Sequence, residues 1–380
     1  MSGWVVVGGL GAAAWSWLLA CHGRFWLADQ RLPPLVEPAP WPSVAVVVPA
    51  RDEAGVLRAS LPSLLAQRYP GRARVILVDD NSGDGTAELA RRLATETGGI
   101  RLSTTCPGEP REGWTGKLWA LAHGVSEAGE VDYLLFTDAD IAHGPGSLSD
   151  LVAAATGGWD LVSLMATLRT GTGWERLLVP AFVYFFAMLY PFRWVNRPTA
   201  RTAAAAGGCV LVRREVLARA GGIAAIRGAL IDDVALARLV KRAGGRTWLG
   251  LANDVHSVRP YPRLAGLWHM IARSAYTQLR HSPLLLAGTV LGLALVFIAP
   301  PAVVITGALT GQVPALLAGG AAWLAMSVSY VPTLRFYGRP LRTAPLLPVT
   351  ALLYAAMTLD SARRHWVGQG AVWKGRGYPT

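Results

Sequence analysis

The sequence predicts an α/β domain built on a mostly parallel sheet and attached to a membrane by apolar segments at both ends of the chain. Between residues 43 and 280, runs of β-branched residues alternate with amphipathic helical patterns, which predicts a sheet covered by helices on both faces. Residues 1–23 and 281–334 are long stretches without Asp, Glu, Lys or Arg. The composition agrees, because 52% of residues are hydrophobic and only 16% are charged, which is too apolar for a wholly soluble protein.

The amino-terminal region predicts a membrane anchor followed by a linker. Residues 1–23 are about long enough to span a bilayer. A cleaved signal peptide is the alternative, but it requires a basic region ahead of the apolar stretch, and the first basic residue is Arg24. Arg24 and Arg31 follow the stretch, so the positive-inside rule places the amino terminus outside and the next residues in the cytosol. Residues 24–42 are a proline-rich linker, which cannot form a helix.

The carboxyl-terminal region predicts further membrane segments. Residues 281–334 have room for two helices of ~20 residues, separated near Gly311 and Gln312. Residues 335–380 comprise a basic loop, a short apolar run over 343–359 and a basic tail. If that run spanned the membrane, the basic tail would lie outside, so we expect it to be interfacial or re-entrant. The segments predict a multi-pass protein of a bacterial-type inner (cytoplasmic) membrane with its folded domain in the cytosol.

The folded domain contains the alternating elements in order. Strands are expected at 43–48, 74–78, 133–137 and within 203–212, and helices at 54–67, 87–95 and 231–243. Residues 177–192 are charge-free and aromatic but short for a span; a core helix is possible, and we favour an interfacial or re-entrant segment. No G-x-G-x-x-G or G-x-x-x-x-G-K-[ST] motif follows a predicted strand, which disfavours dinucleotide and P-loop proteins.

Charge and cysteine content narrow the class of protein. The net charge of +12 suits nucleic acid, anionic lipid headgroups or a polyanionic small substrate. The positive residues gather near the apolar segments, with seven positive residues and one negative residue from Arg335 onward. We therefore expect contact with anionic membrane lipids and no nucleic-acid partner. Cys21, Cys106 and Cys209 are widely spaced, so we expect no disulfide framework and no zinc site, which fits a reducing cytosol.

Carboxylates follow the first three predicted strands at the point where each strand ends. Asp52 follows the first strand, Asp79 and Asp80 the second, and Asp138 and Asp140 the third, and Asp232 and Asp233 open a later helix. Each alone is more often a turn former or a helix cap. Ligands of open α/β sheets bind beyond the carboxyl ends of the strands, so the complete set predicts one crevice lined by acids. Paired carboxylate oxygens there suit a hard divalent cation bound to a diphosphate.

The motifs VPARDEA, VDDNSGDGT, GWTGKLWAL, TDAD and IDDVAL together resemble family 2 of the inverting glycosyltransferases, which use nucleotide sugars on a GT-A fold. The resemblance covers roughly residues 43–279. The stretches LWHMIARSAYTQLRHSPLLLAGTVLG, AAAAGGCVLVRRE and WKGRGY extend it to bacterial hopene-associated glycosyltransferases, membrane enzymes linked to hopanoid lipids. It implies a GT-A-like, mostly parallel sheet flanked by helices, between an amino-terminal anchor and carboxyl-terminal transmembrane helices.

The resemblance also implies a role for each motif. Asp52 would bind the nucleobase, Asp80 the base or ribose, and Lys117 the phosphates. Asp138 would lie against the ribose and the metal, with Asp140 as the principal ligand of Mg²⁺ or Mn²⁺. The expected donor-binding residues are Pro49, Arg51, Asp52, Glu53, Asp79, Asp80, Lys117 and Asp138.

The remaining expected roles concern transfer to the acceptor. Asp233 would be the general base, helped by Asp232, which stands where the family usually has Glu. The sugar or acceptor pocket would contain Gly207, Gly208, Trp268 and Arg273. Arg259 and Arg273 are candidates for the acceptor or diphosphate side, and a structural role on the membrane face is an equal alternative.

The chemistry of sugar transfer matches these residue types. A nucleoside diphosphate develops negative charge as it leaves, which a divalent cation neutralises, and an acceptor hydroxyl needs a carboxylate to take its proton. The Gln-x-x-Arg-Trp motif of processive synthases is missing, which favours a single transfer. We expect inverting, metal-dependent transfer of one sugar from a UDP-sugar to a hydroxyl of a membrane lipid, which the resemblance implies is a hopanoid. The alternatives are transfer to polyprenyl phosphate and a non-catalytic nucleotide-sugar-binding membrane protein.

Overall fold

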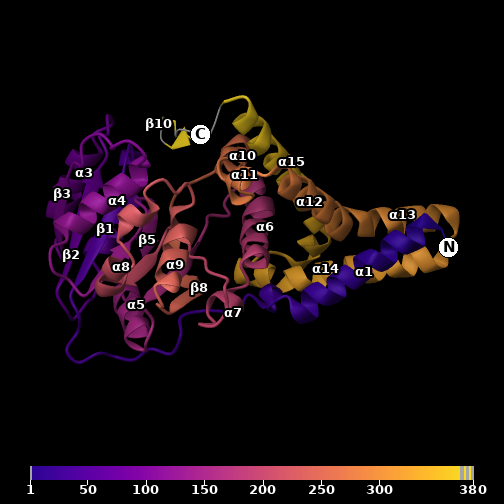
Figure 1. The fold of residues 1–380 in the computed structure, drawn as a ribbon, viewed down its shortest axis with the longest axis horizontal. Helices are drawn as coiled ribbons and strands as arrows, with labels where there is room; N and C mark the ends of the chain where they lie inside the picture. The colour runs from indigo at the N-terminus through magenta and orange to yellow at the C-terminus, as the bar shows by residue number, and fades with distance from the viewer. Residues whose placement is uncertain (1, 369–371, 374–375, 378–380) are drawn as a thin grey trace.

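The protein has a globular α/β domain at one end and a bundle of long apolar helices that projects from it (Figure 1). The structure is a computed structural model that describes residues 2–368, 372–373 and 376–377. Much of the predicted basic tail, including Lys374, lies outside the described residues. Helices at the junction, α6, α10, α11 and α15, lie between the domain and the projecting bundle (Figure 1).

The sheet of the domain has the strand order β3-β2-β1-β4-β7-β6-β8-β5. Its strands are β1 (Val44–Ala50), β2 (Ala73–Asp79), β3 (Arg101–Thr105), β4 (Tyr133–Phe136), β5 (Ile141–His143), β6 (Leu161–Thr167), β7 (Val210–Arg213) and β8 (Thr247–Ser257). The first four are parallel neighbours, and β7 is antiparallel to both β4 and β6. The parallel half brings the carboxyl ends of β1, β2 and β4 to one edge, which carries the predicted carboxylates.

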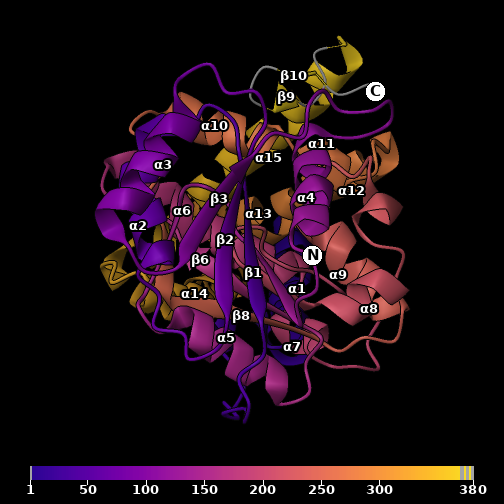
Figure 2. The ribbon, with the colours of Figure 1, turned by 90° about the vertical axis from the view of Figure 1, so that its left-hand side faces the viewer.

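Helices cover both faces of the sheet because its central strands are apolar on both sides. Along β1, Val44, Val46 and Val48 face one core, which the helices α2, α3 and α5 cover, and Ala45 and Val47 face a second core beneath α4, α8 and α9. Figure 2 shows α2 and α3 on one side of the strands and α4, α8 and α9 on the other. These helices are α2 (Ala54–Leu65), α3 (Thr86–Thr97), α4 (Gly116–Glu127), α5 (Ser147–Thr156), α8 (Arg214–Arg219) and α9 (Asp232–Arg242).

Among the described residues, four helices are long and apolar enough to cross a membrane. They are α1 (Gly3–Cys21), the continuous helix Pro283–Thr310, α14 (Val313–Phe336) and the helical segment Leu341–Trp366. The second of these combines α12 (Pro283–Leu293), a π-helical turn η3 (Ala294–Ile298) and α13 (Ala299–Thr310). It ends at Gly311, which has a φ of 68°, a conformation that glycine adopts readily. The break is at the predicted position.

The segment predicted at 177–192 forms a single helix, α6 (Gly173–Leu189), which begins earlier than expected. A capping box of Thr172 and Glu175 starts it. Its buried side chains belong to the same apolar core as Trp15 and Tyr330 of the projecting bundle, and Tyr184 OH lies 2.6 Å from Ser329 Oγ of α14. The helix is unbroken, so it does not make a re-entrant turn, and its packing is that of the core-helix alternative.

The last apolar segment enters the bundle and returns to the domain side. The 3₁₀ helix η4 (Leu341–Leu346) lies beside the middle of α14, where Trp323 Nε1 donates to Pro345 O at 3.1 Å. From there α15 (Leu347–Trp366) runs back until the His365 ring stacks on the His281 ring, with centroids 4.2 Å apart, next to the start of α12. The helical segment is longer than the predicted run over 343–359. Two short helices, α10 (Leu264–Ala272) and α11 (Ala275–Gln278), connect the domain to α12.

Candidate active site

Lys117 joins two of the predicted acidic motifs. It lies in the first turn of α4, which Thr115 caps by accepting a hydrogen bond from Leu118 N. Its ammonium nitrogen is 2.8 Å from Asp138 Oδ1, beyond the end of β4, and 3.0 Å from Asp232 Oδ2 at the start of α9. Burial lowers the pKa of Lys117, but the two carboxylates outweigh it and the net pKa is raised. A fixed positive charge therefore lies at the carboxyl edge of the sheet.

Asp233 is held beside this cation by two backbone N–H groups. Gly207 N donates to Oδ2 at 2.8 Å and Val234 N donates to Oδ1 at 2.7 Å. Burial, and then the neighbouring Asp232 carboxylate, raise the pKa of Asp233 to about 7, against the opposing effects of Lys117 and the two hydrogen bonds. A carboxyl group with a pKa near neutrality suits the acceptance of a proton at physiological pH.

The two predicted pocket glycines have different surroundings. A Cβ on Gly207 would lie 3.4 Å from both Asp233 Oδ2 and Lys117 Nζ, so this glycine keeps the space beside the two groups open. Gly208 instead packs on Ile141, whose Cδ1 would be 3.1 Å from an added Cβ, and its carbonyl accepts from Thr137 Oγ1. Gly207 thus faces the site, and Gly208 supports the sheet behind it.

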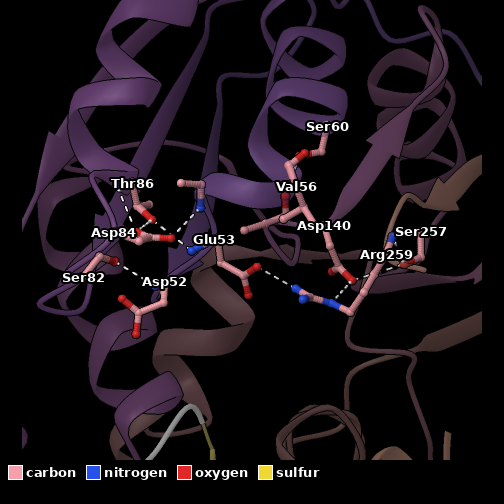
Figure 3. Close-up of polar contacts among 12 residues, drawn as sticks. Asp52, Glu53, Val56, Ser60, Ser82, Asp84, Thr86, Asp140, Ser257 and Arg259 are labelled. Carbon is pink, nitrogen blue, oxygen red and sulfur yellow. Dashed lines mark hydrogen bonds and ion pairs between the residues drawn. The ribbon is translucent and has the colours of Figure 1, made fainter. Parts of the chain in front are cut away.

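Asp140 pairs with a second cation, Arg259, and belongs to a second charged group. The Arg259 guanidinium lies between Asp140 and Glu53 (Figure 3), with Nε 2.9 Å from Asp140 Oδ2 and Nη2 2.6 Å from Glu53 Oε2. Ser257 Oγ donates to the same Asp140 oxygen at 3.1 Å. Burial lowers the pKa of Arg259, but the two carboxylates raise it by more, so the net pKa is raised. Arg259, which follows β8, therefore ties the third strand end to the first.

The loops after β1 and β2 are bonded to each other. Asp52, with a φ of 51°, accepts from Gly83 N at 2.9 Å, and its own N donates to Ser82 Oγ. Asp79 accepts from the N–H and hydroxyl of Ser82, which is the contact of a turn-forming residue. Arg51 Nη1 donates to the carbonyl of the fully buried Asp80 at 2.6 Å. The first two predicted donor-binding motifs thus form one rigid edge (Figure 3).

The predicted metal ligands Asp138 and Asp140 offer hard oxygen donors of the kind Mg²⁺ and Mn²⁺ take. The Asp138 side chain is 37% exposed while bonded to Lys117 through Oδ1. Among the described residues, no group of three or more His, Cys, Asp or Glu side chains is arranged to hold a metal ion. A cation there would therefore need phosphate oxygens and water to complete its shell, which is the usual way Mg²⁺ is held. The two aspartates fit that arrangement.

Two cavities adjoin the acidic residues. A small one of about 10 Å³ is lined by Pro49, Lys117, Asp138, Asp232 and Asp233, among others. A large one of about 1080 Å³ runs from Ile231 and Val234, on either side of the Asp232–Asp233 pair, to α10, α11 and the end of α15.

The structure separates the two residues predicted on the acceptor side. Arg273 lines the large cavity. Trp268 is not among the residues that line it, because its indole packs into the junction core and donates to Asp360 Oδ2 of α15 at 2.9 Å. This contact fastens α10 to α15, and a role of Trp268 in the sugar or acceptor pocket stays a prediction.

Sequence reasoning missed several cavity residues that come from distant segments. Arg238 lies in α9, Arg280 and His281 follow α11, and Arg364 and His365 end α15. The sequence does show an excess of basic residues near the apolar segments. That excess did not indicate that these side chains line one cavity.

The chain is similar to several proteins of known activity. It is 30% identical over 185 residues to an undecaprenyl-phosphate 4-deoxy-4-formamido-L-arabinose transferase of Pseudomonas paraeruginosa, a match covering 46% of this chain and 48% of the relative. It is 34% identical over 99 residues to a 4,4'-diaponeurosporenoate glycosyltransferase of Staphylococcus haemolyticus, covering 26% and 24%. The chain thus spans about half or less of the length of these curated relatives.

A solved structure extends the likeness over the whole fold. The mannosyltransferase PcManGT from Pyrobaculum calidifontis, in complex with GDP-Man and Mn²⁺, superposes with a TM-score of 0.56 and 20% identity, covering 94% of this chain and 99% of that one. The domain is therefore GT-A-like, as the motifs predicted. The model of glycosyl transferase family 21 matches residues 12–379. The chain is a glycosyltransferase and belongs to glycosyl transferase family 21.

Proposed function

We propose that this glycosyltransferase moves a single sugar from a nucleotide sugar to a hydroxyl group of a membrane lipid, with inversion at the anomeric carbon. The observation that carries the proposal is the position of Asp233. It lies beside the charged cluster of Lys117 and Asp138, and the residue after it lines the cavity that leads to the apolar helices. A base between a phosphate-binding edge and a route for an apolar acceptor suits transfer to a lipid.

The reaction is a single displacement. The acceptor oxygen forms a bond to the anomeric carbon while the bond from that carbon to the diphosphate breaks, and Asp233 takes the hydroxyl proton. The hydrogen bonds from Gly207 N and Val234 N fix the direction of the carboxylate. Lys117 offers positive charge where the diphosphate develops negative charge.

A divalent cation, when bound by Asp138 and Asp140 with the donor phosphates, would supply Lewis-acid neutralisation of the leaving group. We propose Mg²⁺ or Mn²⁺ in this place and UDP as the nucleotide. The structure with GDP-Man and Mn²⁺ is a mannosyltransferase, so a metal is compatible with the shared fold.

The test pairs two variants of the full-length protein. Asp233→Asn should bind donor normally and lose transfer by about 10²–10⁴-fold, the usual contribution of a general base. Asp140→Ala should lose Mn²⁺-dependent nucleotide binding, measured by calorimetry with UDP in the presence and absence of Mn²⁺. Near-normal transfer to lipid by Asp233→Asn would rule out its role as base.

Transfer to a polyprenyl phosphate is the second candidate, favoured by the undecaprenyl-phosphate transferases among the relatives. A phosphate oxygen is already ionised at neutral pH, so that reaction needs no base. Full activity of Asp233→Asn on polyprenyl phosphate would therefore support this candidate.

For the acceptor we propose a hopanoid, on the resemblance of the junction sequence LWHMIARSAYTQLRHSPLLLAGTVLG. Mass spectrometry of lipids from cells with and without the chain tests this directly. A glycosylated hopanoid that disappears with the chain supports it, and unchanged lipids together with a changed polysaccharide contradict it.

We further propose that the domain lies in the cytosol beside an inner (cytoplasmic) membrane, with the amino terminus outside. Three helices would span, and the segment 341–366 would enter and return. This arrangement keeps Arg335, Arg339 and Arg342, together with the basic end of α15, on the cytosolic side, as the positive-inside rule requires.

A further inference from the structure

One part of the large cavity is formed by α11, the loop before α12 and the end of α15. Cationic and aromatic side chains line this part. Four arginines and three histidines line the cavity as a whole, and no Asp or Glu is among its lining residues within the described chain. The basic lining residues are Arg238, Arg273, Arg280, Arg364, His269, His281 and His365. A concave surface of one sign concentrates counter-ions of the other sign.

Four of these residues form a group that we call the boundary site: Arg280, His281, Arg364 and His365. The first two immediately precede α12, which begins at Pro283, and the last two end α15. The group therefore lies where two of the apolar helices meet the domain (Figure 1), which is the depth of lipid headgroups if these helices lie in a bilayer.

The boundary site is held together by aromatic and hydrogen-bonding contacts. The His281 and His365 rings stack at 4.2 Å, and Tyr276 packs on both with centroids 5.4 Å away. Tyr276 OH donates to the His281 carbonyl at 2.8 Å, and Tyr276 N donates to Ser361 Oγ at 3.0 Å. The loop before α12 and the end of α15 are thus fixed relative to each other, so the site does not need to be assembled by its ligand.

The arginines of the boundary site retain capacity for an anion. Arg364 bonds Asp360 through Nε at 2.7 Å, while Asp360 also accepts from Arg363 and from Trp268. The Arg280 side chain makes no ion pair within the described part of the chain. Guanidinium groups bind phosphate oxygens through two parallel N–H···O bonds.

We propose that the boundary site binds the phosphate of an anionic membrane phospholipid, with its acyl chains along the apolar faces of α12 and α15. The boundary site lines the same cavity as the proposed acceptor route, but its residues lie apart from the acidic cluster, so the proposal does not rest on Asp233 being the base. Exposed apolar side chains flank it, Leu284 and Leu285 on α12 and Trp366 on α15, as a bound lipid requires.

Lipid binding to the full-length protein in a non-ionic detergent tests the proposal, with no sugar donor present. Short-chain phosphatidylglycerol and short-chain phosphatidylcholine are the probes, the latter because its quaternary ammonium should be repelled by the arginines. We expect tighter binding of phosphatidylglycerol, and about a fivefold loss for each of Arg280→Gln and Arg364→Gln, since one arginine near an anionic lipid surface is worth about that much.

The control variant is Arg58→Gln/Arg92→Gln, which removes two exposed arginines of α2 and α3 on the far side of the domain. It should leave lipid binding unchanged, and Arg280→Lys should keep the preference for phosphatidylglycerol. Normal UDP binding by each variant shows that it is folded.

Three outcomes would overturn the proposal. They are equal binding of the two lipids by the unaltered protein, no effect of the two boundary-site variants, and binding of inorganic phosphate that depends on the same arginines but is not displaced by phosphatidylglycerol. The last would assign the site to a free phosphate. Because sugar transfer is not measured, these results do not depend on the acceptor or on Asp233 being the base.

Discussion

At the scale of single residues, the proposed role of Asp233 as general base depends on its position between one cation, Lys117, and one like charge, Asp232. Its pKa of about 7 means that the ionised, proton-accepting form predominates only above neutral pH. We expect the turnover rate at saturating substrate to rise with pH up to about 7 and to fall about tenfold per unit below it. A pH–rate profile of the purified enzyme measures this.

Replacing the neighbouring Asp232 carboxylate tests the cause of the raised pKa of Asp233, because it should shift the pH–rate profile in a known direction. Asp232→Asn removes the like charge that raises the pKa of Asp233 and leaves Lys117 closer to uncompensated. Both changes lower that pKa, so the rising limb of the profile should move to lower pH. A limb that stays in place, or moves to higher pH, contradicts this account of Asp233.

Among the residues at this edge of the sheet, we expect substitution of Arg259 to lower the free energy of unfolding most. Arg259→Gln would leave Asp140 and Glu53 without the cation that lies between them. These groups are only partly exposed, so we expect about 2 kcal/mol of lost unfolding free energy. Denaturant unfolding followed by tryptophan fluorescence measures it, with Arg259→Lys expected to lose less.

The sequence predicted which carboxylates stand at strand ends but not which cation each would meet. Asp138 and Asp140 alternate along the chain, and the structure sends the first to Lys117 and the second to Arg259, a residue 119 positions away. That choice depends on how β8 crosses the sheet, which local patterns do not encode. Arg259 was therefore expected as a candidate for the acceptor or diphosphate side, with a structural role on the membrane face as an equal alternative, and its pairing with Asp140 was not foreseen.

At the scale of elements, α4 shows how closely a helix must approach the sheet to deliver Lys117. A Cβ on Gly124 would lie 2.3 Å from Val47 Cγ1, so no side chain fits between α4 and β1. Gly124→Ala should destabilise the protein by about 1–3 kcal/mol, as overpacking of a core does, and weaken nucleotide binding by displacing Lys117.

Gly55 is the matched control for this substitution. It is also helical, in α2, but nothing lies within 4 Å of an added Cβ. Gly55→Ala should be neutral or stabilising by up to about 1 kcal/mol. Thermal unfolding in detergent compares the two, and an equal loss in both would contradict the packing argument.

Whether a segment forms a helix or a strand was predictable where its apolar residues recur with a clear period. Whether a strand runs parallel or antiparallel to its neighbours was not predictable. The strands β1, β2 and β4 and the helices that follow β1 and β2 formed where expected. The antiparallel β7 between β4 and β6 is set by the long excursion through α6, which the pattern of β7 does not reveal. Pro345 and Pro348 made the run over 343–359 look short, but they lie in a 3₁₀ helix and in the first turn of α15, where a missing N–H costs little.

At the scale of the whole molecule, the proposed orientation predicts which loops can be reached from outside the cell. In a variant with Cys21 and Cys106 replaced by Ser, and Cys209 buried, Gln312→Cys should react with a membrane-impermeant maleimide in intact cells. Val367→Cys should react only after the membrane is opened, because α15 returns to the domain side. Labelling of position 367 from outside would show instead that the segment 341–366 crosses the bilayer.

The filled interior of the helix bundle has a consequence for the fate of the product. Trp15, Phe297 and Met326 are buried where α1, α14 and the helix Pro283–Thr310 meet, so the space between these helices is occupied by side chains. A sugar attached at the domain side cannot be threaded through such a packed bundle. If the acceptor is a membrane lipid, as we propose, the glycolipid would stay in the leaflet where the acceptor was taken up, and a separate flippase would be needed to turn it to the opposite leaflet.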